Sequence, residues 1–129
     1  MDSYNADEKP SARMWLNLDE FESLSIVEQY HQQIGDTAPN EMLHAMMHVV
    51  IENQLAADDP AEAARTLARL MKAGLDRHDA IHALASVQSE IMFEFVKGTG
   101  AVTDPNQEYE QALKRLTAKG WLAAQDPSE

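Results

Sequence analysis

Apolar side chains recur along this chain at intervals of three and four residues, the spacing that places them on one face of an α-helix. In residues 40–57, for example, the repeat predicts a buried face made of Leu43, Met47, Val50, Ile51 and Leu55. No segment alternates convincingly between apolar and polar residues, as a half-buried strand would. The pattern therefore predicts an all-α protein.

Capping and turn residues divide this pattern into helices, because Asn and Asp precede the helical segments and Gly follows them. Since short loops make successive helices antiparallel neighbours, we expect an up-down helical bundle of four main helices plus a C-terminal helix. The expected helices run from Leu18 or Ser23 to Ile34 before Gly35, from Asn40 to Ala57, from Pro60 (capped by the preceding Asp) to Gly74, from Asp76 to Lys97, and from residues 103–105 to Gly120.

The two ends of the chain lack this periodicity. Residues 1–12 are polar and acidic and contain Pro10, which is typical of a flexible tail. Trp121 begins a short apolar anchor that leads into a second flexible tail at 123–129. A chain of 129 residues is long enough for one hydrophobic core, so we expect residues 13–122 to form a single helical-bundle domain.

The balance of acidic and basic residues indicates which classes of binding partner to expect. The net charge is −12, and no Lys or Arg stands between Met14 and Ala64. Nucleic-acid binding requires clustered positive charge, so we do not expect a nucleic-acid partner. The same negative field favours a cation or a basic partner, and it is compatible with a protein partner or a homo-oligomer.

Other features of the sequence bear on the cellular compartment in which the protein is expected. The chain has no cysteine, which excludes disulfides, thiol nucleophiles and Cys-ligated zinc. The N-terminus lacks the basic flank and apolar core of a signal peptide, and the longest apolar runs are far shorter than a membrane span. We therefore expect a cytoplasmic protein with no membrane partner.

Four of the five histidines form two pairs with i, i+4 spacing, His44 with His48 and His78 with His82. Such a pair occupies one helix face within a single turn and can bind one metal ion. The helices that carry the two pairs should run parallel, because an intervening helix returns the chain between them. Both pairs then lie near the same end of the bundle, and the antiparallel first helix brings His31 there as well. The sequence thus predicts a histidine-rich site at one end of the bundle.

Carboxylates accompany these histidines. Glu28 precedes His31 by three residues, and Glu52 follows His48 by four, so both are candidate metal ligands beside the five histidines. Imidazole and carboxylate ligands suit a divalent metal, with Zn or Fe favoured. Three further side chains are expected to support the ligands or join their polar network: Tyr30, Gln54 and Asp79.

Three functions remain open at this point. The first is a metal-binding bundle, in which an open coordination position would permit hydrolysis by metal-activated water, or oxygen chemistry with Fe. The second is a non-enzymatic interaction or regulatory domain with a structural histidine network. Metal content, together with an open ligand position, separates it from the first. The third is a divergent metal-dependent His-Asp phosphohydrolase, suggested by His78-Asp79, although the final Asp of that family has no clear counterpart beyond Asp104. No catalytic residue is assigned.

Four blocks of the chain resemble a small bacterial family of uncharacterised all-helical domains. The blocks are "WLNLDE" (15–20), "VEQYH" (27–31), "LHAMMHVVIENQLA" (43–56) and "RLMKAGLDRHDAIHALASV" (69–87). The resemblance spans about residues 14–97 and includes every histidine. It implies no activity, and it implies a polar signature made of Glu28, His31, His44, His48, Glu52, His78 and His82.

Overall fold

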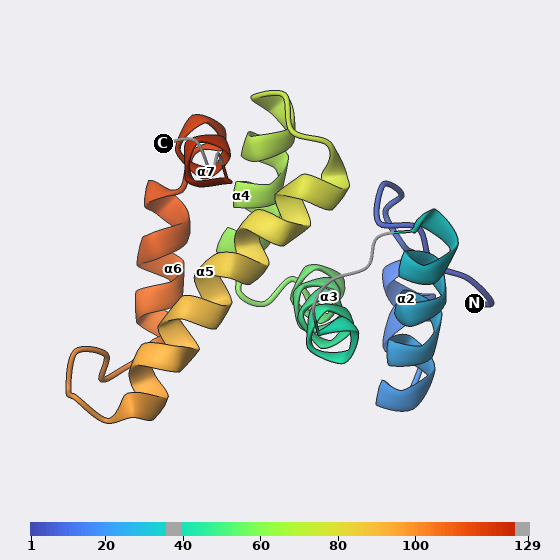
Figure 1. Cartoon of the computed structure of the whole chain (residues 1–129), viewed down its shortest axis with the longest axis horizontal. Helices are drawn as coiled ribbons and strands as arrows, with labels where there is room; N and C mark the ends of the chain where they lie inside the picture. The colour runs from blue at the N-terminus through green and yellow to red at the C-terminus, as the bar shows by residue number, and fades with distance from the viewer. Residues whose placement is uncertain (36–39, 126–129) are drawn as a thin grey trace.

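The computed structural model describes residues 1–35 and 40–125, and all regular secondary structure in these ranges is helical (Figure 1). This confirms the all-α helical bundle. None of the described helices is long and apolar enough to cross a bilayer. The helices are α1 (Ala12–Leu16), α2 (Glu20–Ile34), α3 (Glu41–Ala57), α4 (Ala61–Lys72), α5 (Arg77–Lys97), α6 (Pro105–Arg115) and α7 (Ala118–Gln125).

Side-chain caps fix most helix starts where the sequence predicts them. Asp19 forms a capping box with Glu22 at the start of α2, so each satisfies a backbone N–H of the other. Asn40, Asp76 and Asp104 cap α3, α5 and α6 through their side-chain oxygens. Left-handed glycines, Gly35 and Gly98, end α2 and α5.

Several boundaries differ from those expected, and the short helix α1 was not predicted. Pro60 is the N-cap of α4 and makes no side-chain capping bond, so the helix begins one residue later than predicted. Gly120 does not end the last expected helix. That helix, α6, ends at Arg115, and a separate α7 begins where the Thr117 hydroxyl accepts the N–H of Gly120. The expected C-terminal tail is therefore partly helical, and residues 126–129 of it lie outside the described residues.

The central helix α3 separates two hydrophobic cores. Ala45 and Val49 pack into an N-terminal core with residues of α1 and α2, whereas Ile51 packs into a C-terminal core built by α3 to α7. Figure 1 looks along α3 but shows α2 and α5 from the side. Helix α3 therefore crosses its neighbours, where the sequence led us to expect parallel helices.

Within residues 1–12, Tyr4 and Ala6 pack against the helices, so this segment is not the flexible tail that we expected. Tyr4 is 5% exposed and Ala6 is fully buried, and both belong to the N-terminal core. The short helix α1 adds Trp15, which is 1% exposed and donates its indole N–H to Asn53 at 2.7 Å. This segment lacks a helical period, and polar contacts described below help to hold it in place.

Candidate metal centre

Five histidines meet where α2, α3 and α5 come together. His31 lies in the last turn of α2. The two histidine pairs lie in the N-terminal halves of α3 and α5. One ring nitrogen of each histidine lies within 4.8 Å of one from every other. The convergence predicted from the sequence is therefore present, and the five are His31, His44, His48, His78 and His82.

Four of these side chains point the same atom, Nε2, at a common centre. The Nε2 of His31 lies 3.2 Å from that of His48 and 3.1 Å from that of His44. The Nε2 of His82 lies 2.9 Å from that of His48 and 3.2 Å from that of His44. These contacts close a ring of four nitrogens.

The tautomer of His31 follows from the contact of its other nitrogen. The Nδ1 of His31 lies 2.9 Å from the carbonyl oxygen of Val27, one turn earlier on α2. Because a carbonyl oxygen only accepts, the proton of the neutral ring is on Nδ1. The Nε2 of His31 therefore presents a lone pair to the centre.

The protonation of His48 follows in the same way through Tyr4. The Tyr4 hydroxyl donates to the Glu52 carboxylate at 2.6 Å and lies 3.3 Å from the Nδ1 of His48. Burial and the Glu52 charge raise the pKa of Tyr4 above its ordinary value, so the phenol keeps its proton. Since that proton is given to Glu52, the hydroxyl oxygen accepts from His48, whose Nε2 is left with a lone pair.

A buried ion pair anchors this chain of hydrogen bonds. Arg77 donates to the two carboxylate oxygens of Glu52 at 2.7 and 2.8 Å, and the two residues are only 4% and 2% exposed. The two-pronged geometry satisfies both groups and fixes the carboxylate in place. Glu52 therefore acts behind His48, through Tyr4.

His48 is neutral at this site. It is 1% exposed, and burial lowers its pKa far below the ordinary value because a charged ring would lose its hydration. The neighbouring histidines lower it further, with His82 the largest of these contributions. A neutral imidazole is the form that binds a metal ion.

Hydrogen bonding within the ring of four nitrogens cannot satisfy all four contacts. Each neutral Nε2 carries either one proton or one lone pair, so it can take part in only one such bond. At most two of the four contacts can therefore be hydrogen bonds. The contact between His31 and His48 is not one of them, because both atoms present lone pairs at 3.2 Å. A cation at the centre would bind all four nitrogens at once.

The predicted carboxylate ligands lie elsewhere. Within the described residues, the group of potential ligands that surrounds the centre contains histidines only. Glu52 forms the ion pair behind His48, and Glu28 is half-buried on α2 outside that group. A carboxylate on the same helix stripe as a histidine can thus be held away from the centre by a basic residue on a neighbouring helix.

The three predicted supporting residues have different surroundings. The Tyr30 hydroxyl lies 3.5 Å from the Nδ1 of His78, and its ring packs edge-on against His31. Gln54 accepts from the Tyr109 hydroxyl at 2.7 Å, a contact in the C-terminal core. The backbone N–H of Asp79 donates to the capping Asp76.

Two residues of the site were not predicted. Tyr4 lies in an aperiodic segment, and its role depends on a contact with a residue 44 positions away. Arg77 lies inside one of the sequence blocks that carry the family resemblance, and the helical pattern gives it no role of its own. A signal for Arg77 exists, because a carboxylate on the buried stripe of α3, such as Glu52, requires a cation.

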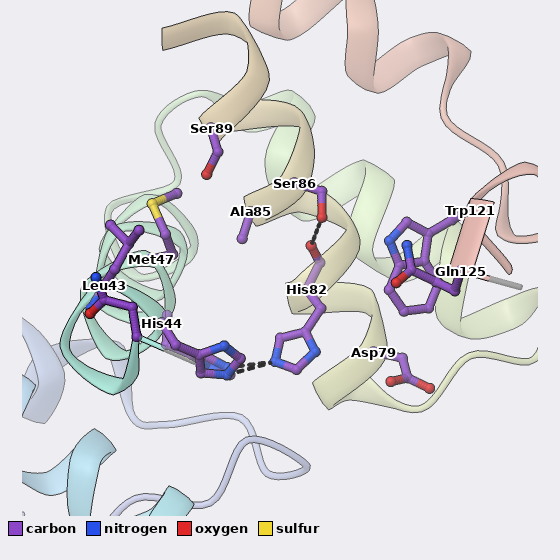
Figure 2. A pocket seen from close by; sticks show the side chains of 12 residues that line it. Leu43, His44, Met47, Asp79, His82, Ala85, Ser86, Ser89, Trp121 and Gln125 are labelled. Atoms are coloured by element: carbon purple, nitrogen blue, oxygen red, sulfur yellow. Dashed lines mark hydrogen bonds between the residues drawn. The ribbon is translucent and has the colours of Figure 1, made fainter. Parts of the chain in front are cut away.

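An open groove of about 810 Å³ lies beside the centre. Figure 2 shows the side chains that line it. His44, His48 and His82 line one part of it, so the centre is accessible from solvent. Asp79 also lines the groove, and burial and the charge of Asp76 raise the pKa of its carboxyl. The rest of the lining combines apolar and neutral polar side chains, among them Met47, Ser86, Trp121 and Gln125.

Comparison with known proteins adds a family to this geometry. No curated protein and no solved structure matches the chain. Residues 16–115 match a family that is described as a domain of unknown function, DUF1841. The match contains all five histidines, Glu52 and Arg77, and it extends further toward the C-terminus than the resemblance noted from the sequence. The chain is therefore a member of the DUF1841 family of domains of unknown function.

Proposed function

We propose that this protein binds one divalent transition-metal ion, Zn²⁺ or Fe²⁺, through the Nε2 atoms of four histidines. They are His31, His44, His48 and His82. The observation that carries this proposal is the 3.2 Å contact between the lone pairs of His31 and His48, which only a shared cation or a shared proton makes favourable. A proton would serve that one contact and leave the others, whereas a metal ion accepts every lone pair.

The spacing of the four nitrogens fits this role. A metal–nitrogen bond of about 2.0–2.1 Å places neighbouring ligand nitrogens roughly 2.9 Å apart at a right angle and roughly 3.4 Å apart at the tetrahedral angle. The four contacts of the ring, at 2.9 to 3.2 Å, fall inside this range. His78 is close enough to supply a fifth nitrogen.

The type of ligand favours particular ions. Imidazole nitrogens bind Zn, Fe, Cu and Ni, whereas Mg and Ca prefer oxygen ligands, which this group lacks. The buried hydrogen bonds from Nδ1 of His31 to Val27, and from His48 to Tyr4, hold both rings in the metal-binding tautomer. We take Zn²⁺ and Fe²⁺ as the first ions to test.

The groove supports catalysis as a second candidate function. Three of the proposed ligands line it, so an ion held by them would face solvent on that side. A water molecule bound there would lose a proton near neutral pH and become a nucleophile. Asp79 lines the same groove, and in this candidate function its carboxylate would accept a proton from such a water or from a substrate.

The test is the metal content of protein purified without a His tag, measured by plasma mass spectrometry after incubation with Zn²⁺ or, without oxygen, with Fe²⁺. The expected result is about one equivalent per chain, as for a single mononuclear site. A His48→Ala/His82→Ala double variant should lose the ion. Glu28→Ala is the matched control, since Glu28 lies outside the ligand group and its removal should leave the metal content unchanged.

Circular dichroism on each variant shows that the helices are intact. Folded wild-type protein that stays metal-free with both ions would overturn the proposal. Loss of the ion in Glu28→Ala, with His48→Ala/His82→Ala still loaded, would place the ion at another site. Either result would favour the structural histidine network.

A further inference from the structure

We propose that the N-terminal segment is a latch for the metal centre, so that metal binding and the docking of this segment strengthen each other. We define the latch as residues 4–7. The inference rests on the proposed function, and it adds a form of regulation to that site: any process that pulls the latch away weakens the hold on the metal.

The latch makes four polar contacts with the core, and all four go to the neighbourhood of the histidines. The Tyr4 hydroxyl bridges His48 and Glu52. The carbonyl oxygen of Ala6 accepts from Arg77 at 3.0 Å. The Asp7 carboxylate accepts the backbone N–H of His78 at 3.2 Å. The latch thus touches one proposed ligand, the backbone of a second histidine and both members of the supporting ion pair.

The latch is held in shape by a local turn. The side-chain oxygen of Asn5 accepts the backbone N–H of Asp7 at 2.9 Å, and its carbonyl oxygen accepts the N–H of Glu8 at 3.0 Å. This turn directs the Ala6 carbonyl toward Arg77 and the Asp7 carboxylate toward the start of α5.

The Tyr4 ring is placed by aromatic neighbours. It packs edge-on against Tyr30 and His48, with ring centroids 5.4 and 6.1 Å away, and at a tilt against Trp15 at 5.8 Å. These contacts belong to the ring and not to the hydroxyl. Replacement of Tyr4 by Phe therefore removes the hydrogen bonds while it keeps the packing.

The hydroxyl connects the latch to the metal through the tautomer of His48. With Tyr4 docked, the His48 proton stays on Nδ1 and Nε2 is free for an ion. Without an acceptor behind it, the buried Nδ1–H is unsatisfied, and the ring can relieve this by moving the proton to Nε2. A protonated Nε2 cannot bind a metal.

Metal binding must in turn strengthen the docking of the latch. A metal ion on Nε2 fixes the proton of His48 on Nδ1, which gives the Tyr4 hydroxyl a donor to accept from. Because binding free energies are reciprocal, the factor by which the docked latch tightens metal binding equals the factor by which metal tightens the latch. The docking of the latch combines these polar contacts with the burial of the Tyr4 ring and of Ala6.

The first test compares Tyr4→Phe with Tyr109→Phe. Tyr109 is the matched control: it is 3% exposed and donates a 2.7 Å hydrogen bond to Gln54, but it lies in the C-terminal core. Zn²⁺ affinity is measured by competition with a colorimetric chelator. Tyr4→Phe is expected to bind Zn²⁺ 10- to 100-fold more weakly, as for loss of a supporting hydrogen bond to a ligand, and Tyr109→Phe is expected to match the wild type.

The second test follows the latch itself by amide hydrogen exchange and mass spectrometry, in wild-type protein with and without Zn²⁺. Peptides that cover residues 4–7 should exchange more slowly when Zn²⁺ is bound. In Tyr4→Phe the slowing should be reduced, whereas Tyr109→Phe should retain it. This test needs no unfolding and remains valid if a variant is less stable.

The outcomes separate the latch from the proposed function. Wild-type protein that binds Zn²⁺, with equal affinity in Tyr4→Phe and no metal-dependent protection of the latch, would overturn the latch and leave the metal site standing. Equal weakening in both Tyr→Phe variants would show a general stability effect and would also overturn it. Wild-type protein that binds neither Zn²⁺ nor Fe²⁺ would remove both proposals.

Discussion

The two cores on either side of α3 are built from different chemistry. The N-terminal core contains Tyr4, Trp15 and Tyr30, and it borders the buried polar side chains of His31, His48, Glu52 and Arg77. The C-terminal core is mainly aliphatic, with many alanines and with fully buried leucines and isoleucines. Its representative members are Ile51, Leu70, Ile81, Leu84 and Leu113.

This contrast separates the roles of the two regions. Burial of charged or polar groups is unfavourable unless each finds its partner, so the N-terminal core depends on complete pairing. Burial of aliphatic side chains is favourable in proportion to their area, so the C-terminal core can support the fold. Helix α5 extends from one region to the other and carries His78 and His82 at its N-terminal end.

The largest loss of stability is expected where a buried charged group loses its ion-pair partner. Arg77→Met leaves the Glu52 carboxylate buried without its cation, which should lower the free energy of unfolding by about 3–5 kcal/mol. Urea denaturation measures the loss. Arg69→Met is the control, since Arg69 donates to the backbone carbonyls of Leu113 and Leu116 at a more exposed position, and its loss should cost about 0.5–1.5 kcal/mol. Equal losses in the two variants would contradict the contrast.

The next largest loss of stability is expected from a substitution that leaves a cavity in the aliphatic C-terminal core. Leu113 is fully buried on α6, and Leu113→Ala should cost about 2–5 kcal/mol through lost burial and the void that remains. The protein that stays folded should still bind metal with wild-type affinity, because Leu113 belongs to the other core. The check is urea denaturation together with chelator competition. Metal binding that weakens in parallel with stability would show that the two regions are coupled.

The smallest effect is the response to acid, measured on metal-free protein in chelator. The pKa of His48 is lowered on folding, so below about pH 6.5 the unfolded chain takes up a proton that the folded chain does not. Stability should therefore be lost as pH falls, by about 1.4 kcal/mol per pH unit from this group. His48→Gln should flatten the acid dependence, whereas Leu113→Ala should lower the whole curve without a change of slope. A wild-type curve no steeper than that of His48→Gln would show that His48 is protonated in the fold.

Helix boundaries could be predicted because their causes are local. Asn40, Asp76 and Gly98 each act on backbone groups within a few residues, and the structure has them where the sequence indicates. Gly120 misled the prediction, because a glycine in a short helix is tolerated when the preceding turn is capped by Thr117. The approach of the five histidines was also predictable, although α3 crosses α5 instead of running parallel to it. The prediction that the histidines converge is still correct, because they lie near the helix ends that meet.

The support behind the histidines could not be predicted in the same way. Helical spacing shows which residues share a face of one helix, but not which residue of another helix lies opposite. Glu52 shares the stripe of His48 and was assigned as a ligand, yet Arg77 on α5 pairs with it. Tyr4 has no periodic context at all, and its position is set by aromatic and polar contacts that exist only in the assembled fold.

The bounds of the family match have a practical consequence. The match spans residues 16–115, so Tyr4 precedes it and Trp121 and Gln125 follow it. A recombinant fragment cut at those bounds keeps every histidine but loses the hydroxyl behind His48 and one wall of the groove. The family match thus covers the residues of the proposed metal site, whereas the Tyr4 hydroxyl and part of the groove lining come from the segments that flank it.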